Sequence, residues 1–241
     1  MARAMARGWG EPVLCSDGGS GRAAALAAEL GGRAASNLEV AEESDLVILC
    51  HKPAQFAAVA EEIGGRAKAV ASVLSSVSTD SLRSAYQPAP VFRLTPNTPV
   101  EVRRGTVCYS PAEGVDPELE RTVIALFERL GTVVRVQEQL LGVAGAVMGV
   151  GPAYQALLAE AQVDAAVRHG LSPAVASQLV IETMSGSAAL LEARDYDTLA
   201  VRREVTSPGG TTARGLDALE RGGVRAAFQV AIDRVCEEPR R

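Results

Sequence analysis

Short apolar runs alternate with helical patterns over the first half of this sequence, and only helical patterns follow. The alternation predicts an open α/β sheet of Rossmann type over residues 1–137, followed by an all-helical domain over residues 138–241. Residues 46–50 form a continuous apolar run, which is typical of a parallel strand buried on both faces.

The remaining elements of the first half follow from the same patterns. After Asp116-Pro117, an apolar stripe through Leu119, Val123 and Phe127 predicts an amphipathic helix. Shorter helices are expected over residues 20–30, 54–63 and 79–85, and strands over residues 12–15, 46–50, 69–74, 91–94, 106–109 and 133–136.

Helices alone are expected after residue 137. Residues 138–170 predict one long helix that is bent near 149–152, and Ser172-Pro173 supplies an N-cap and a first helical residue for a helix to about residue 192. Further helices are expected over residues 211–221 and from Gly222-Gly223 to about residue 237.

The start of the chain lacks the strand and the Gly-x-Gly-x-x-Gly turn that open a dinucleotide-binding fold. Residues 1–8 already have the pattern of the first helix, so about seven to ten residues are expected to be missing before Met1. Either the start codon is assigned too late, or the central strand is lost. The first explanation is favoured, because losing a central strand would expose two sheet edges.

Composition excludes several classes of function. The net charge of −5 gives no basic surface for nucleic acid, and no apolar run reaches the length of a membrane span. The four cysteines have no metal-ligand spacing, so no metal site is expected. With no signal-peptide pattern at the N-terminus, we expect a cytoplasmic protein.

The most informative segment is Ser207-Pro208-Gly209-Gly210-Thr211-Thr212, which lies between two helical patterns. Pro208 ends the preceding helix, and the two glycines let the backbone approach a ligand closely. Free N–H groups at the following helix start, beside two hydroxyls, would bind a small carboxylate. A tight turn with a threonine N-cap is the alternative.

Four ordered segments resemble pyrroline-5-carboxylate reductases, which use NAD(P)H to make proline from a cyclic imine. Besides Thr206–Thr212, they are the buried strand that ends at Lys52-Pro53, the Pro96-Asn97-Thr98-Pro99 turn and Gly149-Val-Gly-Pro-Ala-Tyr154. The resemblance covers essentially the whole chain. It implies reduction of 1-pyrroline-5-carboxylate to L-proline in an oligomer, a dimer or higher, held together by the helical domain.

The resemblance also implies roles for individual residues. Thr212 would be catalytic, with its hydroxyl at the imine nitrogen, and Glu138 would lie near the substrate or act only as a helix N-terminal acid. Substrate binding falls to Glu138, Ser207, Gly209, Gly210 and Thr211. Cofactor binding falls to Ser16, Asn37, Cys50, His51, Lys52, Pro53, Leu74 and Ser75.

Cofactor preference stays open between NADP and NAD, with NADPH slightly favoured. Asp17 would favour a free 2′-hydroxyl, whereas Arg22 would accept a 2′-phosphate. His51 stands where the family has an apolar residue, and it is given no catalytic role.

Several residues depart from the family pattern. Met148 and Val150 replace two serines, and Leu74-Ser75 replaces two small residues that line the nicotinamide pocket. An imine reductase with another substrate, or a catalytically impaired homologue that acts as a dimeric scaffold, therefore stays an alternative. A β-hydroxyacid dehydrogenase would need a lysine on the long helix, and no lysine follows Lys68.

Overall fold

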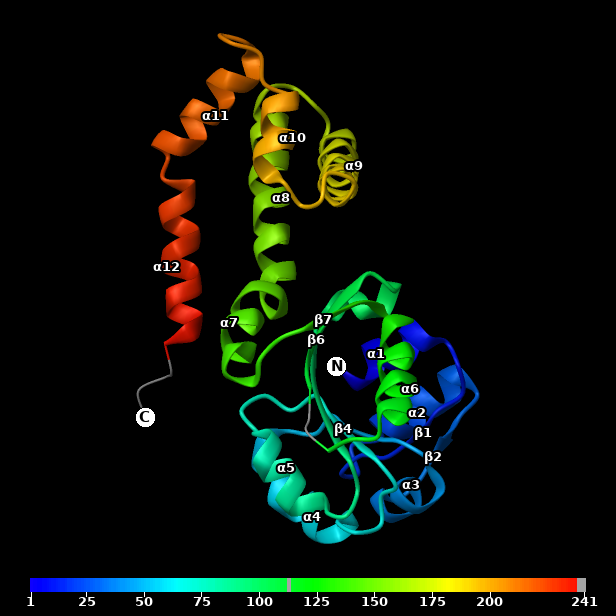
Figure 1. The fold of residues 1–241 in the computed structure, drawn as a ribbon. Coiled ribbons are helices and arrows are strands. Elements are labelled where there is room, and N and C mark those ends of the chain that lie inside the picture. Colours follow the sequence, from blue (N-terminus) through cyan, green and yellow to red (C-terminus); the bar gives the residue numbers. More distant parts are fainter. Residues whose placement is uncertain (112–113, 238–241) are drawn as a thin grey trace. The chain divides into compact units, whose positions relative to one another are not determined.

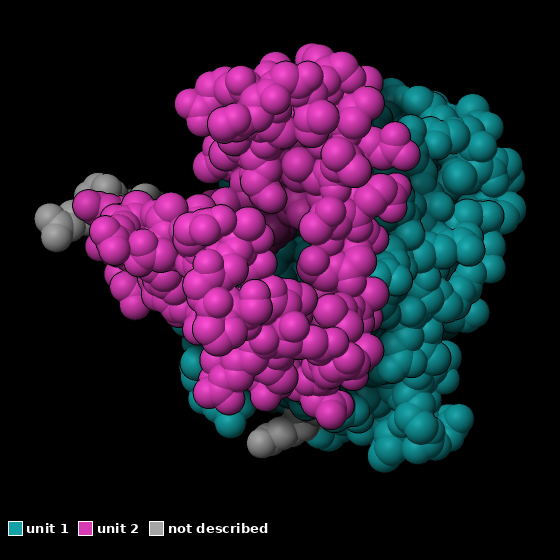
Figure 2. Space-filling view, turned by 90° about the horizontal axis from the view of Figure 1, so that it is seen from above, with its two compact units in different colours: residues 1–152 teal, residues 153–241 magenta. Residues whose placement is uncertain are grey.

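The computed structural model describes residues 1–111 and 114–237. It divides into two compact units, Met1–Pro152 and Ala153–Arg241, which Figures 1 and 2 show and which are treated separately here. The first unit contains all the strands of the described chain.

A five-stranded sheet forms the centre of the first unit, in the order β3-β4-β5-β6-β7. Strands β3, β4 and β5 are parallel, with Val70 paired to both Val47 and Val91. The sequence predicted all five strands. Their bounds are β3 Val47–Leu49, β4 Val70–Ser72, β5 Val91–Pro96, β6 Gly105–Ser110 and β7 Gly131–Arg135.

Strand β6 runs antiparallel to β5, which departs from an all-parallel sheet. Only the short 3₁₀ helix η2 (Thr98–Val102) connects the two strands. A parallel pair would need a crossover of a dozen or more residues, so the short connection dictates the antiparallel direction. Strand β7 then returns to a parallel pairing after helix α6 (Pro117–Glu128).

A separate two-stranded parallel sheet joins β1 (Leu14–Cys15) to β2 (Arg33–Ala34). Strand β1 was predicted, whereas β2 was not. Both residues of β2 are exposed, so the strand has no apolar pattern that would reveal it.

Helices cover both faces of the five-stranded sheet (Figure 1). One core packs β-strand residues such as Phe92 and Tyr109 with Met5 and Phe127, from α1 and α6. The other packs Val47, Val70 and Val91 with Ile63 and Leu82, from α4 and α5. The bounds are α1 Ala2–Trp9, α2 Arg22–Leu30, α3 Asn37–Glu43, η1 Pro53–Gln55, α4 Phe56–Ile63 and α5 Thr79–Tyr86.

Helix α1 is the first element of the chain, as the sequence pattern predicted, and it packs against η2. A Cβ on Gly8 would lie 2.2 Å from the Val100 carbonyl oxygen, so only glycine permits this approach. The Trp9 indole Nε1 donates to the Leu126 carbonyl at 2.9 Å, and its ring meets Phe127 edge-on. These contacts fix α1 between η2 and α6.

The chain leaves β7 through a broken helix. It consists of η3 (Glu138–Leu140), α7 (Leu141–Ala144), a π-helical turn η4 (Gly145–Gly149) and α8 (Gly151–Arg168). The sequence predicted a bend near residues 149–152, and the π turn, a frequent cause of bends, immediately precedes that position.

The second unit is helical. Its helices after α8 are α9 Pro173–Glu192, α10 Thr198–Glu204, α11 Thr211–Arg221 and α12 Val224–Cys236. Ser172 caps α9 as predicted, by accepting from the Val175 N–H, whereas α10, which Asp197 caps, was not predicted. Tyr154 and Phe228 pack edge-on and join α8 to α12.

Much apolar surface of the second unit is exposed. Leu157, Leu179 and Ile181 are 64%, 54% and 55% exposed, whereas only Ala159 and Ala176 are buried on α8 and α9. By length and composition alone, Glu138–Arg168 and Pro173–Glu192 could each cross a membrane, with mean hydropathies of 1.4 and 1.3. Such an apolar surface needs a cover.

Candidate active site

The predicted cofactor residues follow the strands of the first unit. Cys50–Pro53 follows β3, and Leu74 and Ser75 follow β4. Because β3 and β4 are parallel, both loops leave the sheet at its carboxyl edge, where α/β folds bind ligands. Ala4 of α1 and Cys50 pack against the same core of the sheet.

Ser16 and Asn37 are joined by a hydrogen bond. Ser16 Oγ donates to Asn37 Oδ1 at 2.7 Å, and Asn37 Nδ2 donates to Glu62 Oε2 at 2.6 Å. The chain of contacts fixes the orientation of the Asn37 amide, which begins α3. Sequence reasoning missed Glu62, because nothing near it in the sequence marks it as a partner of Asn37.

Asp17 is occupied by its own loop. Its Oδ1 accepts from the N–H groups of Gly19 and Ser20, and its Oδ2 accepts from the Ser20 hydroxyl and from the Ala23 N–H at the start of α2. These hydrogen bonds lower the pKa of Asp17 to about 2, and the bond from the Ala23 N–H has the largest effect. The carboxylate therefore organises the loop, and the Arg22 side chain, whose Nε donates to Ser20 Oγ, lies beside it.

The residues after β3 differ in character. Burial raises the pKa of the Cys50 thiol to about 12, which keeps the thiol protonated and unreactive. His51 Nδ1 lies 3.0 Å from the Lys52 carbonyl oxygen, so this nitrogen carries the proton. His51 Nε2 is buried and has no hydrogen-bond partner within the described residues. Lys52 is exposed, and Pro53 opens the 3₁₀ turn η1.

Leu74 and Ser75 point to different environments. Leu74 is 5% exposed and packs in the core beneath α4 and α5, whereas Ser75 is exposed. The leucine that replaces a small residue of the family pattern therefore has its side chain in the core. Any ligand contact of Leu74 would come from its backbone.

Glu138 lies at the start of the broken helix and accepts hydrogen bonds from residues of α5 and β5. Its Oε1 accepts from the Thr79 N–H at 2.7 Å and from Arg93 Nη1. Burial raises the pKa of this carboxyl, but the Thr79 amide and the Arg93 guanidinium outweigh that effect and lower it overall. Sequence reasoning missed Arg93, which lies 45 residues away on β5.

The glycine turn of the second unit joins α10 to α11. Gly209 has a φ of 68°, and the Gly210 N–H donates to the Ser207 carbonyl at 3.1 Å. A Cβ on Gly210 would lie 2.4 Å from Ser207 Oγ, so the turn requires glycine there. Both glycines of the motif are thus accounted for by backbone geometry.

Helix α11 begins without a side-chain cap, as α1, α2, α4 and α12 also do, whereas α3, α5, α6, α9 and α10 are capped. The hydroxyls of Thr211 and Thr212 are exposed, and within the described part of the chain they form no hydrogen bond. The first N–H groups of α11 and two hydroxyls are therefore available to an anion.

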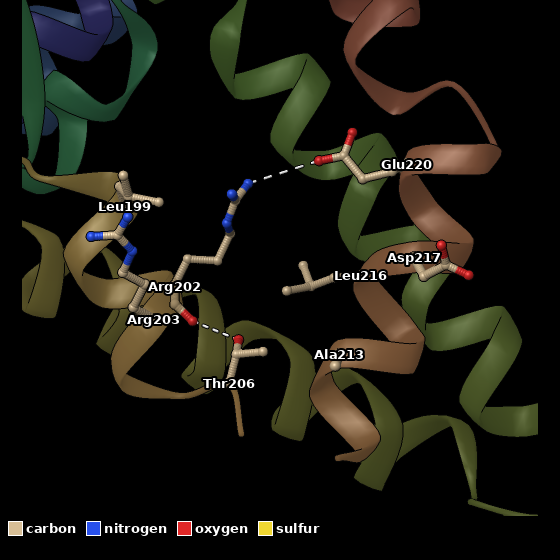
Figure 3. Close-up of a pocket in the computed structure, with 8 residues that line it drawn as sticks. All are labelled: Leu199, Arg202, Arg203, Thr206, Ala213, Leu216, Asp217 and Glu220. Atoms are coloured by element: carbon tan, nitrogen blue, oxygen red, sulfur yellow. Dashed lines mark hydrogen bonds and ion pairs between the residues drawn. The ribbon is translucent and has the colours of Figure 1, made fainter. Parts of the chain in front are cut away.

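A cleft of about 570 Å³ lies between α10 and α11 (Figure 3). Arg202 reaches across it toward Glu220, with 3.8 Å between Nη1 and Oε1, and Thr206 Oγ1 donates to the Arg202 carbonyl at 2.5 Å. The predicted substrate residues 207–212 do not line it. The cleft therefore borders the glycine turn rather than containing it.

The carboxyl edge of the first unit offers several of the groups that a dinucleotide needs, but no Gly-x-Gly-x-x-Gly turn leads into α1 in this sequence. The edge offers an exposed Lys52 ammonium, the Ser16–Asn37 pair and the unpartnered His51 Nε2, and α1 begins with uncapped N–H groups. Among residues 1–111 and 114–237 no group of three or more His, Cys, Asp or Glu side chains could hold a metal ion.

Two family models match the chain. Residues 1–78 match NADP oxidoreductase coenzyme F420-dependent, and residues 138–241 match pyrroline-5-carboxylate reductase dimerisation. The second match begins at Glu138, whereas the compact units divide after Pro152.

Known proteins resemble the chain over most of its length. A pyrroline-5-carboxylate reductase of Synechocystis is 34% identical, over 81% of this chain and 74% of the relative. The crystal structure of 1-pyrroline-5-carboxylate reductase from Streptococcus pyogenes superposes with a TM-score of 0.87 at 28% identity, covering 98% and 93% of the two chains. The Plasmodium falciparum pyrroline carboxylate reductase with NADP bound has a TM-score of 0.84 at 25% identity, covering 97% and 90%.

Proposed function

The chain belongs to the pyrroline-5-carboxylate reductase family, and from that premise we propose that it reduces 1-pyrroline-5-carboxylate to L-proline with NADPH or NADH. The observation that carries the proposal is the glycine turn before α11. A helix start with no side-chain cap and two unbonded threonine hydroxyls matches a substrate that has a carboxylate next to a ring nitrogen.

In this reaction the nicotinamide supplies a hydride to the imine carbon when the cofactor is bound. The chain's own residues bind the substrate and handle the ring nitrogen. We assign the carboxylate to Ser207, Gly209, Gly210 and the Thr211 N–H, because the turn presents backbone donors there. The Thr212 hydroxyl then forms a hydrogen bond with the ring nitrogen, which is protonated before the hydride arrives and becomes the amine nitrogen of proline.

Glu138 is the charged residue of this proposal. Its carboxylate is ionised at neutral pH, because Thr79 and Arg93 lower its pKa. We propose that Glu138 contributes to substrate binding by its charge, because an ionised carboxylate favours the charged form of the imine, which is the more reactive toward hydride.

Cofactor binding is assigned to the carboxyl edge of the first unit. We propose Ser16 and Asn37 for the adenosine half, and the segments Cys50–Pro53 and Leu74–Ser75 for the rest of the cofactor. Support comes from the fixed Asn37 amide, the exposed Lys52 ammonium and the free His51 Nε2. Since Asp17 is occupied by its own loop, we propose that NADPH is preferred.

The chain forms homo-oligomers through its helical region, as the dimerisation model over residues 138–241 supports. We propose that a second copy, rather than lipid, covers the exposed apolar side chains of α8 and α9. The domain boundary proposed near residue 138 places all of these side chains in the oligomerising part. The proposal is for a cytoplasmic homodimer or larger assembly.

One assay tests the function. Oxidation of NADPH is followed by absorbance with 1-pyrroline-5-carboxylate, and the product is identified as proline by mass spectrometry. Substrate-dependent oxidation with formation of proline supports the proposal. A protein that binds cofactor but makes no proline is instead the impaired homologue, and turnover of other cyclic imines alone indicates another substrate.

A further inference from the structure

Arg93 is a partly buried cation whose role the family resemblance did not assign. Its side chain is 14% exposed, and it lies on β5, level with Ser72 of β4 and Ser110 of β6. Paired residues of neighbouring strands lie on the same face, so the three form a polar row across the sheet. A cation in such a position is costly unless it is paired.

The partner of Arg93 is Glu138. Arg93 Nη1 and the Thr79 N–H both donate to Oε1, and the Thr79 hydroxyl also lowers the pKa of this carboxyl. Thr79 is the first residue of α5, so the carboxylate also lies at the positive end of a helix dipole. Arg93 is the charged side chain within ion-pair distance of Glu138 among the described residues.

We propose that Arg93 is a positioning residue that keeps the Glu138 carboxylate ionised and fixed in orientation for its role toward the imine substrate. This inference rests on the proposed function, because it specifies how Glu138 is presented to the imine. Arg93 touches neither substrate nor cofactor in this scheme, and it acts through Glu138.

The alternative is a purely structural ion pair that ties the segment after β7 to β5. Loss of Arg93 raises the pKa of Glu138 in both cases, so the two roles differ in whether the activity depends on that ionisation. A positioning Arg93 keeps the carboxylate charged for catalysis, so its loss raises the pKa of Glu138 and reduces activity first at low pH. A structural Arg93 affects stability and leaves the pH profile of the reaction in place.

The kinetic test compares Arg93→Ala, Arg93→Lys and Thr79→Pro with the wild type. Proline is tolerated at the first helical position and removes the donated N–H of Thr79. An opposite charge at this distance lowers a carboxyl pKa by about one to three units. We therefore expect the acid limb of kcat/KM to move to higher pH in Arg93→Ala than in the wild type, with a partial return in Arg93→Lys. Thr79→Pro should shift less.

Arg66→Ala is the control, since it breaks an exposed ion pair with Glu42 far from these contacts in the sequence. Its kcat/KM profile should match the wild type at every pH. At pH 8, where Glu138 is ionised in all variants, Arg93→Ala should still lose about ten- to a hundred-fold in kcat/KM through lost orientation. An unchanged acid limb with a lower melting temperature would make Arg93 a structural anchor and overturn the proposal.

A second measurement does not depend on turnover. The difference in unfolding free energy between wild type and Glu138→Gln is measured by urea denaturation across the same pH range, with and without Arg93→Ala. A carboxyl with a lowered folded-state pKa stabilises the protein above its unfolded pKa, and this is lost on acidification. If Arg93 sets the ionisation, Arg93→Ala abolishes or reverses that dependence; an unchanged dependence contradicts the proposal. An inactive wild type would refute the proposed function alone.

Discussion

Asn97 connects the end of β5 to the π-helical turn through the backbone of Met148. Its Nδ2 donates to the Met148 carbonyl oxygen at 3.0 Å, and its Oδ1 accepts from the Thr106 N–H at 2.8 Å. One buried amide thereby joins β5, β6 and η4. The Asn-Thr-Pro motif thus has a structural role, and the contact at position 148 does not involve the side chain that departs from the family pattern.

The first prediction follows from this contact. Asn97→Ala would leave the partly buried Thr106 N–H and Met148 carbonyl without partners, at no more than about 1–3 kcal/mol for each group. We expect the free energy of unfolding to fall by a few kcal/mol, measured by urea denaturation. Met148→Ser is the matched variant and should change this value little. Equal losses in both variants would show that the Met148 side chain carries the stability.

The second prediction concerns the glycine turn. Thr212→Ala should lower turnover by about 10² to 10³, because one positioned hydrogen bond in a closed site contributes roughly 2–4 kcal/mol to the barrier. Thr211→Ala should lose much less, since its assigned contact is the backbone N–H. The checks are turnover at saturating imine and the thermal midpoint. Near-wild-type turnover of Thr212→Ala would leave the segment as a structural turn.

The third prediction concerns cofactor choice. Because Asp17 accepts four hydrogen bonds from its own loop, Arg22 is left to meet a 2′-phosphate. We expect Arg22→Ala to raise the KM for NADPH about tenfold and to leave the KM for NADH near its wild-type value. Steady-state kinetics with both cofactors measure this. An equal rise in the KM for NADPH and the KM for NADH would mean that Arg22 does not bind the 2′-phosphate.

Asp17 should behave differently from a ribose-binding carboxylate. Its folded-state pKa of about 2 lies below the ordinary value of 3.8, so its stabilising effect is present above about pH 4 and is lost as the pH falls toward 2. We expect Asp17→Ala to lower the thermal midpoint at pH 6, with the difference from wild type shrinking on acidification. A pH-independent difference in thermal midpoint would show that the stabilising effect does not come from the charge of Asp17.

The sequence predicted the elements that have a local apolar pattern, but it did not predict side-chain partners that lie far apart in the chain. The strands β3 to β7 and helix α6 were predicted correctly, because each has its own apolar pattern. Strand β2, helix α3 and helix α10 were missed, because short exposed elements have little such pattern. The family motifs indicated Glu138 and Asn37, but their partners Arg93 and Glu62 come from other elements and could be found only in the folded chain.

The last prediction concerns the exposed apolar side chains of α9. Leu179 and Ile181 are more than half exposed, although burying a side chain of this kind contributes about 1.5–3 kcal/mol. We expect Leu179→Glu to weaken or abolish the oligomer, because a second copy would have to bury the new charge without a partner. Light scattering at micromolar concentration measures the assembly. Glu182→Gln on the same helix is the control and should leave the mass unchanged. If Leu179→Glu retains the wild-type mass, the interface lies elsewhere on the second unit.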